Sequence, residues 1–201
     1  MTTPPPAAPR SRRSAERTRR RVLDAAVQAI TERGTGVSLS QVAALAGVSK
    51  SGMLHHFGTR EQLFTAVVED ANERFRAEVL AHLDLSENRA GKMLRAYVRA
   101  LCGGSSEVAQ YFASAPTWNG LYTIPALAQA MEADDEWWTE QFTLDGLDPD
   151  LVQVVRRAAE GIAAAAGFGE ETPEAVARGR ATLLAMTERG AAGYPPPLPT
   201  R

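Results

Sequence analysis

Apolar residues recur along most of the chain three and four positions apart, a spacing that places them on one face of a helix. In residues 14–33 this apolar face consists of Val22 or Leu23, Ala26 or Val27, and Ile30. Gly34 and Gly36 follow directly and predict the end of that helix. No stretch of useful length shows the alternation of apolar and polar residues that is typical of a strand. The pattern therefore predicts an all-α protein.

Residues 35–63 predict two short helices joined by a tight turn. Ser38 and Gln41 have the three-residue spacing of a capping box at a helix start, and Gly47 supplies the turn. The second short helix spans about residues 50–57. The apolar residues of the motif predict a small core beneath it, formed by Val42, Ala43, Ala46, Val48, Met53 and Phe57. This layout is typical of a DNA-binding helix-turn-helix.

Six more helices are predicted, which makes about nine in all. Their expected ranges are about 59–83, 93–101, 108–115, 125–142, 149–166 and 173–189. Asp148-Pro149 and Thr172-Pro173 predict the last two starts, because each pair offers a capping side chain followed by a proline suited to the first turn. We expect a disordered basic and Pro-rich tail (1–13), a helical head (14–60), a helical body (61–190) and a Pro-rich tail (191–201).

Charge is distributed unevenly between the two parts. Residues 1–60 contain ten Lys and Arg against three Asp and Glu, whereas residues 61–201 contain twelve against twenty-one. The balances of +7 and −9 sum to the formal net charge of −2. A basic first part indicates that this end binds a polyanion. The alternative is a pair of solvated faces of opposite sign.

The outer face of the second motif helix carries side chains suited to DNA. Residues near the start of a recognition helix read base edges, and Lys50, Ser51 and Gly52 occupy that place. Six residues offer donors for DNA phosphates: Ser38, Ser40, His55, His56, Thr59 and Arg60. The adjacent histidines point about 100° apart on a helix, so they do not converge on one ion and no metal is expected.

This arrangement resembles the TetR family of bacterial transcriptional regulators. The resemblance covers about residues 14–70 and consists of Arg21-Val22-Leu23-Asp24-Ala25-Ala26, the motif from Val42 to Phe57, and Thr59-Arg60-Glu61-Gln62-Leu63. It implies an all-helical homodimer with a three-helix DNA-binding head and a regulatory and dimerisation body of about six more helices. It also implies that Lys50, Ser51 and Gly52 read bases, and that Ser38, His55, His56 and Arg60 hold the DNA backbone.

One position departs from the family pattern. Members often have a tyrosine where Leu54 stands, and the tyrosine hydroxyl contacts a phosphate that Leu54 cannot bind. A basic stretch would compensate along the backbone or in the minor groove: Arg10, Arg12, Arg13, Arg17, Arg19, Arg20 and Arg21. The alternative is a disordered tail followed by a solvated helix start.

The body contains two further candidate sites. Family architecture places an effector pocket among the aromatic middle helices, for which we expect Met93, Tyr97, Trp118, Tyr122 and Trp137. The alternative for helical aromatics is plain core. The family pairs the last two helices with those of a second copy, for which we expect Leu151, Val155, Ala159, Ile162, Val176, Leu183 and Leu184. The alternative is that this face belongs to the core of one chain. The acidic run 132–136 is expected to be an exposed helix face, with a cationic ligand as the alternative.

Together with these features, the resemblance implies a cytoplasmic homodimeric repressor that a small-molecule effector releases from a palindromic operator. No apolar run reaches membrane-spanning length, and Cys102 is expected to be a small buried hydrophobe. We expect no cofactor and no catalysis, because no nucleophile–base pair, spaced metal ligands or phosphate-binding Gly loop is evident. The alternatives are a small-molecule-binding or enzymatic helical protein with an incidental DNA-binding head, and a sequence-neutral architectural DNA binder.

Overall fold

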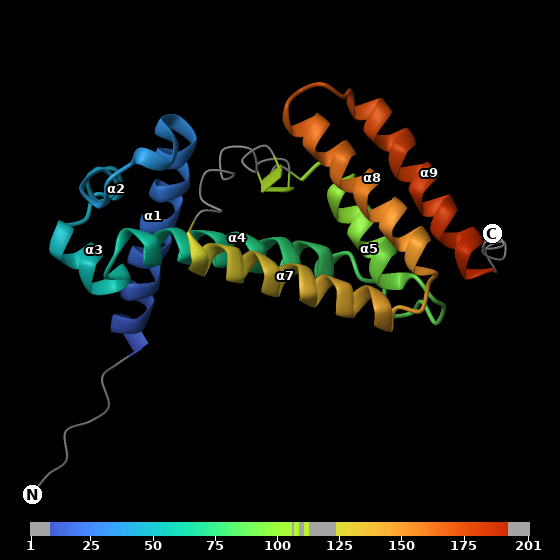
Figure 1. Cartoon of the computed structure of the whole chain (residues 1–201), viewed down its shortest axis with the longest axis horizontal. Coiled ribbons are helices and arrows are strands. Elements are labelled where there is room, and N and C mark those ends of the chain that lie inside the picture. Colours follow the sequence, from blue (N-terminus) through green and yellow to red (C-terminus); the bar gives the residue numbers. More distant parts are fainter. Residues whose placement is uncertain (1–8, 106, 109–110, 113–123, 193–201) are drawn as a thin grey trace, which may run out of the picture. The chain divides into compact units, whose positions relative to one another are not determined.

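The computed structural model describes residues 9–105, 107–108, 111–112 and 124–192, with side chains from Ser14 onward except that of Thr35. The elements in these ranges are all helical (Figure 1): α1 (Pro9–Arg33), the 3-10 helix η1 (Gly34–Gly36), α2 (Leu39–Ala46), α3 (Lys50–Phe57), α4 (Arg60–Ala81), α5 (Lys92–Leu101), α7 (Pro125–Leu144), α8 (Pro149–Gly167) and α9 (Pro173–Ala191). The prediction of an all-α protein is confirmed. The helix expected over 108–115 lies mostly outside the described residues. Within the described part, no helix combines the length and apolar character needed to cross a membrane.

The chain forms two compact units, which we call the head and the body. The head comprises Met1–Asp70 with Thr117–Ala130, and the body comprises Ala71–Pro116 with Met131–Arg201. The division falls within α4, about three turns beyond the boundary that the sequence indicated at residue 60.

Side-chain caps set the starts of the short head helices. Ser38 Oγ accepts from the backbone N–H of Gln41 at 3.3 Å, and Gln41 Oε1 accepts from the backbone N–H of Ser38 at 2.8 Å, which completes the predicted capping box of α2. Ser49 Oγ caps α3 by accepting from the N–H of Gly52 at 3.0 Å. Gly47 ends α2 in the left-handed conformation, at φ 64° and ψ 38°. The predicted turn is therefore confirmed, both in its position at Gly47 and in its need for a glycine backbone conformation.

The head has its own apolar core. α1 contributes the predicted stripe and starts at Pro9, earlier than the expected residue 14. The buried residues of the four head helices include Val22, Leu23, Ala26 and Ile30 of α1, Val42, Ala43 and Ala46 of α2, Met53 and Phe57 of α3, and Leu63, Phe64 and Val67 of α4. Val27 and Val48 are only half-buried. The motif residues therefore act mainly as packing that holds α3 in place.

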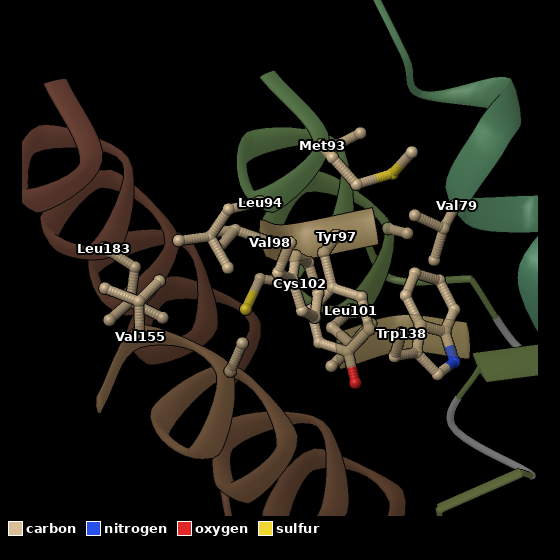
Figure 2. Close-up of a cluster of buried hydrophobic side chains, with 14 of the residues drawn as sticks. Val79, Met93, Leu94, Tyr97, Val98, Leu101, Cys102, Trp138, Val155 and Leu183 are labelled. Carbon is tan, nitrogen blue, oxygen red and sulfur yellow. The ribbon is translucent and has the colours of Figure 1, made fainter. Parts of the chain in front are cut away.

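The body core is centred on α5, of which Leu94, Tyr97, Val98 and Leu101 are buried. Figure 2 shows Val79 of α4 and Trp138 of α7 on one side of these residues, and Val155 of α8 and Leu183 of α9 on the other. Aromatic rings pack edge to face here, with the centroids of Tyr97 and Trp138 5.0 Å apart. Cys102 is 3% exposed, which confirms it as a small buried hydrophobe, and burial raises the pKa of its thiol to about 11.

The body also contains a buried ion-pair cluster that the periodicity did not predict. Arg95 is fully buried, and its Nε donates to Glu87 at 2.7 Å, while Arg99 Nη2 donates to the other carboxylate oxygen at 2.8 Å. Arg95 Nη1 also donates to the carbonyl of Ala90 at 2.9 Å. The buried guanidinium is thus paired with a charge and bound to the backbone of the segment before α5, as a buried charge must be.

Candidate nucleic-acid interface

α3 has one face in the head core and an opposite face in solvent. Met53 and Phe57, four residues apart, are 0% and 5% exposed and face the core. Ser51 and His55, also four residues apart, are exposed, and the helix period puts them about opposite the buried pair. α3 is therefore anchored by its inner face and presents a polar outer face.

The three residues predicted to read bases lie in the first turn of α3. Lys50 and Ser51 are exposed, and Gly52 is half-buried. A Cβ added at Gly52 would lie 3.1 Å from Ser49 Oγ. The hydroxyl that caps α3 therefore leaves little room for a side chain at this position. Any side chain here would also extend the surface that a groove must accommodate.

The six predicted phosphate contacts are all exposed. The Ser38 hydroxyl already donates to Gln41 Oε1 at 2.9 Å, so it offers no further proton to a phosphate while the capping box is intact. Thr59 Oγ1 accepts from the N–H of Gln62 at 3.1 Å, at the exposed start of α4. The Arg60 guanidinium lies 4.9 Å from the centre of the Phe64 ring, a contact that orients it at the start of α4.

Ser40 and His56 remain exposed beside these residues, on α2 and α3 respectively. The ring centroids of His55 and His56 are 5.8 Å apart and their planes are 69° apart. Among the described residues no group of three or more His, Cys, Asp or Glu side chains is placed to hold a metal ion.

The basic stretch of α1 divides into three parts. The side chains of Arg10, Arg12 and Arg13 lie outside the described residues, and Arg17 is exposed. Arg19, Arg20 and Arg21 each contact another part of the head: Phe57, Asp70 and the carbonyls that end α2. Neither DNA binding by these arginines nor a solvated helix start, the two alternatives that the sequence offered, includes these contacts within the head.

Two exposed leucines of the head were not among the predicted site residues. Leu54 of α3 is 40% exposed and Leu45 of α2 is 46% exposed. An exposed apolar side chain on a recognition helix suits the methyl group of thymine, which is an apolar feature of the major groove. The sequence contains this signal, because Leu54 interrupts an otherwise polar face.

The predicted effector-pocket residues lie in different environments. Tyr97 is 2% exposed, and its hydroxyl donates to Glu160 at 2.8 Å, while Met93 is 9% exposed within the same core. Trp137 is half-buried beneath the Arg76 guanidinium, which lies 4.4 Å from its ring centre. Trp118 and Tyr122 lie outside the described residues. A surface hollow of about 380 Å³ is lined by another set, all on α7: Asp135, Glu136, Thr139, Glu140, Thr143 and Leu144.

The predicted dimer residues need correction. Leu151, Val155, Ala159 and Leu183 are between 0% and 5% exposed inside the single chain, because they pack on α5 in the body core. Their side chains are therefore unavailable to a second copy. Ile162, Val176 and Leu184 are half-buried at the edge of that core. The outward face of α8 carries a different set at spacings of four and three, of which Val154 is 56% and Phe168 51% exposed: Val154, Ala158, Gly161, Ala165 and Phe168.

Similarity to known proteins extends over both units. The family model for bacterial regulatory proteins of the tetR family matches residues 22–67, and the model for the tetracyclin repressor-like C-terminal domain matches residues 91–188. The HTH-type transcriptional regulator BetI of Rhizobium meliloti (strain 1021) is 31% identical over 86 residues, which are 41% of this chain and 42% of BetI. The match thus spans less than half of that relative.

Solved structures share the fold. A TetR-family transcriptional regulator from Rhodococcus sp., described as putative, superposes with a TM-score of 0.71 over 87% of this chain and 99% of its own, at 20% identity. A member of the TetR family from Streptomyces coelicolor A3 superposes with a TM-score of 0.66 at 25% identity, over 85% of this chain and 98% of its own. With family models matching the helix-turn-helix and the body in order, the chain belongs to the TetR family.

Proposed function

We propose that this protein is a homodimeric transcriptional repressor that binds a palindromic DNA operator and is released by a small-molecule effector. It would act in the cytoplasm, where that DNA is found. The observation that carries the proposal is α3, which is capped by Ser49, anchored by Met53 and Phe57, and polar on its outer face. An outward helix of this kind enters a major groove and reads base edges.

Within this proposal the outer face of α3 does two jobs. Lys50 and Ser51 contact bases. His55, which the sequence assigned to a phosphate, is placed with them in this proposal because it shares the side opposite Met53 and Phe57. Gly52 lets the helix backbone approach the groove. Ser40, His56, Thr59 and Arg60 hold phosphates on either side, which sets register and affinity without reading sequence.

The second copy is bound through the outward face of α8. Val154 and Phe168 lie at the two ends of a stripe whose middle residues are Ala158, Gly161 and Ala165. Small residues in the middle allow two helices to approach closely, and the large apolar residues at the ends supply buried area. A two-fold dimer then presents two α3 helices to the two half-sites of a palindrome.

The effector acts by linkage. The dimer adopts one arrangement when it binds DNA and another when it binds the ligand. A ligand that prefers the second arrangement weakens DNA binding, and DNA weakens ligand binding by the same factor. Met93, Tyr97, Trp118, Tyr122 and Trp137 stay our predicted lining of that site. A ligand that reaches Tyr97 would displace or use its hydrogen bond to Glu160.

The proposal is tested by titrating the protein onto duplexes that tile the DNA upstream of its own gene, with scrambled duplexes of equal composition as controls. We expect one fragment to bind at least about a thousandfold more tightly than its scramble. Lys50→Ala should lower this ratio, whereas Arg60→Ala should weaken both duplexes alike and make the salt dependence shallower by about one charge.

Equal affinity for every fragment and its scramble would exclude sequence-specific regulation. An unchanged ratio in Lys50→Ala would remove Lys50 from the base-reading set while leaving the wider proposal in place. Ser40→Ala provides a control of small size on the neighbouring helix, for which we expect a loss of affinity that is equal for both duplexes.

A further inference from the structure

Three consecutive arginines of α1 each contact a different helix of the head. Residues that follow one another in a helix point about 100° apart, so Arg19, Arg20 and Arg21 extend in three directions. Arg19 meets α3, Arg20 meets α4, and Arg21 meets the end of α2. These three residues of α1 thus contact both helices of the helix-turn-helix and Asp70 in the middle of α4.

Arg21 holds the turn between α2 and α3. Its Nη2 donates to the carbonyl oxygen of Ala46 and, at 3.3 Å, to that of Gly47. These carbonyls lie at the end of α2, where the helix leaves acceptors unsatisfied and its dipole is negative. A Cβ on Gly47 would lie 2.9 Å from Nη2, so the glycine also leaves room for the guanidinium.

Arg20 joins α1 to α4. Its Nη1 donates to both carboxylate oxygens of Asp70, at 3.1 Å and 3.3 Å, across 50 residues of sequence. Its Nε lies 3.3 Å from a carboxylate oxygen of Asp24 on its own helix. Two carboxylates therefore contact one guanidinium, which is already engaged within the head.

Arg19 reaches the last residue of α3. Its guanidinium carbon lies 5.5 Å from the centre of the Phe57 ring, which is 5% exposed in the head core. This distance allows a cation–π contact. The C-terminal end of α3 is thereby held by α1 while its N-terminal end follows the turn that Arg21 holds.

We propose that Arg19, Arg20 and Arg21 are positioning residues, which fix α3 for base reading without contacting DNA. The proposal rests on the proposed DNA-binding function and specifies how this chain orients its recognition helix. Hydrogen bonds to base edges tolerate misplacement of only about 0.5 Å, whereas attraction to the phosphates is long-ranged. Loss of the three contacts should therefore lower specificity much more than general affinity for DNA.

Asp70 distinguishes this proposal from a phosphate-binding role for Arg20, because the two make predictions of opposite sign. If Arg20 positions the helices, Asp70→Asn should weaken binding to the preferred upstream fragment by about tenfold, as expected for loss of a charged hydrogen bond, and leave the scrambled duplex nearly unchanged. If Arg20 binds phosphate, Asp70→Asn releases the guanidinium, removes a negative charge and strengthens binding to both duplexes.

A double-mutant cycle completes this test. The double variant should lower the specificity ratio by less than the sum of the losses in Arg20→Ala and Asp70→Asn, because both single substitutions break the interaction between Arg20 and Asp70. Additive losses would overturn the role of this pair. The same cycle in thermal unfolding of the intact protein measures the interaction energy of Arg20 and Asp70 without DNA. If the parent protein shows no preference for any upstream fragment, the proposed function is contradicted, but this interaction energy is still obtained.

Arg21 is tested against Arg17, which is exposed on the same helix about one turn earlier. Arg21→Ala should lower the ratio of preferred to scrambled affinity and leave the salt slope on the scrambled duplex unchanged, whereas Arg17→Ala should leave the ratio intact. Arg21→Lys retains the charge but not the planar set of donors, so it should not restore specificity. Full restoration by lysine, or a salt slope shallower by about one in Arg21→Ala, would overturn the proposal for Arg21.

Discussion

Gly47 combines two requirements in a single residue. Its φ of 64° lies in the left-handed region, which side-chain-bearing residues adopt only at a cost. In addition, a Cβ there would lie 2.9 Å from Arg21 Nη2. The first requirement could be anticipated from the turn pattern of residues 46–48. The second depends on a residue 26 positions earlier in the chain, which only the folded head brings to the turn.

Gly47→Ala should therefore destabilise the head and reduce its sequence discrimination. We expect a loss of about 2 kcal/mol in the free energy of unfolding, from left-handed strain and displacement of Arg21. Chemical denaturation followed by circular dichroism measures it. Gly36→Ala is the matched control, since a Cβ there meets nothing within 4 Å and φ is not in the left-handed region. Equal stability of the two variants would contradict this account of the turn.

At the scale of elements, the segment between α4 and α5 is held by charge pairs in an apolar setting. Arg95 is fully buried, and the side chain of Glu87 is 11% exposed. Burial alone would raise the pKa of Glu87, but hydrogen bonds from Arg99 and Arg95 outweigh it, and the pKa lies below its usual 4.5. The ionised form of Glu87 is therefore favoured by folding, and it stabilises the start of α5 above the pH at which it is protonated in the unfolded chain.

Glu87→Gln should lower the free energy of unfolding by about 3 kcal/mol at neutral pH, because it leaves the buried Arg95 charge without a partner. The gap between parent and variant should stay constant above pH 4.5 and narrow as the pH falls through the lowered pKa of Glu87. Urea denaturation across the acidic range measures both effects. The exposed Glu140→Gln is the control, for which we expect little change. A gap that does not depend on pH would show that Glu87 is not held ionised by the two arginines.

At the scale of the whole molecule, the two faces of α8 have separate roles. The inward face, with Leu151, Val155 and Ala159, belongs to the core of one chain. The outward face carries Val154 and Phe168, which are 56% and 51% exposed, with small residues between them, of which Ala158 also packs against the edge of the core. The proposed dimer gives that outward face a partner, and two-fold symmetry brings each of its residues into the interface twice.

Val154→Glu should dissociate the proposed dimer while leaving the chain folded. Two buried carboxylates are introduced per dimer, and their repulsion and desolvation should raise the dissociation constant by about a hundredfold or more, equivalent to about 3 kcal/mol. Sedimentation equilibrium measures the dissociation constant, and circular dichroism reports the fold. Gln153→Glu adds the same charge at the neighbouring exposed position and should have a much smaller effect. A Val154→Glu protein that remains as associated as the parent would place the interface elsewhere.

Local features of the helices could be predicted from the sequence, whereas the partners of their buried faces could not. Starts and ends of helices follow from neighbouring residues, so Ser38 with Gln41, Gly47 and Asp148-Pro149 were located correctly. Thr59 and Gln62 have the same capping spacing and form the same pair of hydrogen bonds, so that signal too was present in the sequence. By contrast, a stripe such as Leu151, Val155 and Ala159 shows that one face is buried but does not say whether its partner is α5 or a second chain.

The sequence by itself determined the all-helical class, the turn between α2 and α3, and the polar outer face of α3, because these depend on residues a few positions apart. Only the tertiary structure decided that Arg19, Arg20 and Arg21 point to three other parts of the head, that Arg95 is paired within the core, and that Leu151, Val155 and Ala159 of α8 pack in the core of their own chain. The contacts of the three arginines and the packing of α8 join residues that are distant in sequence, and the partner of Arg95 lies in the irregular segment before α5; local helical spacing carries no information about which of these groups a side chain meets.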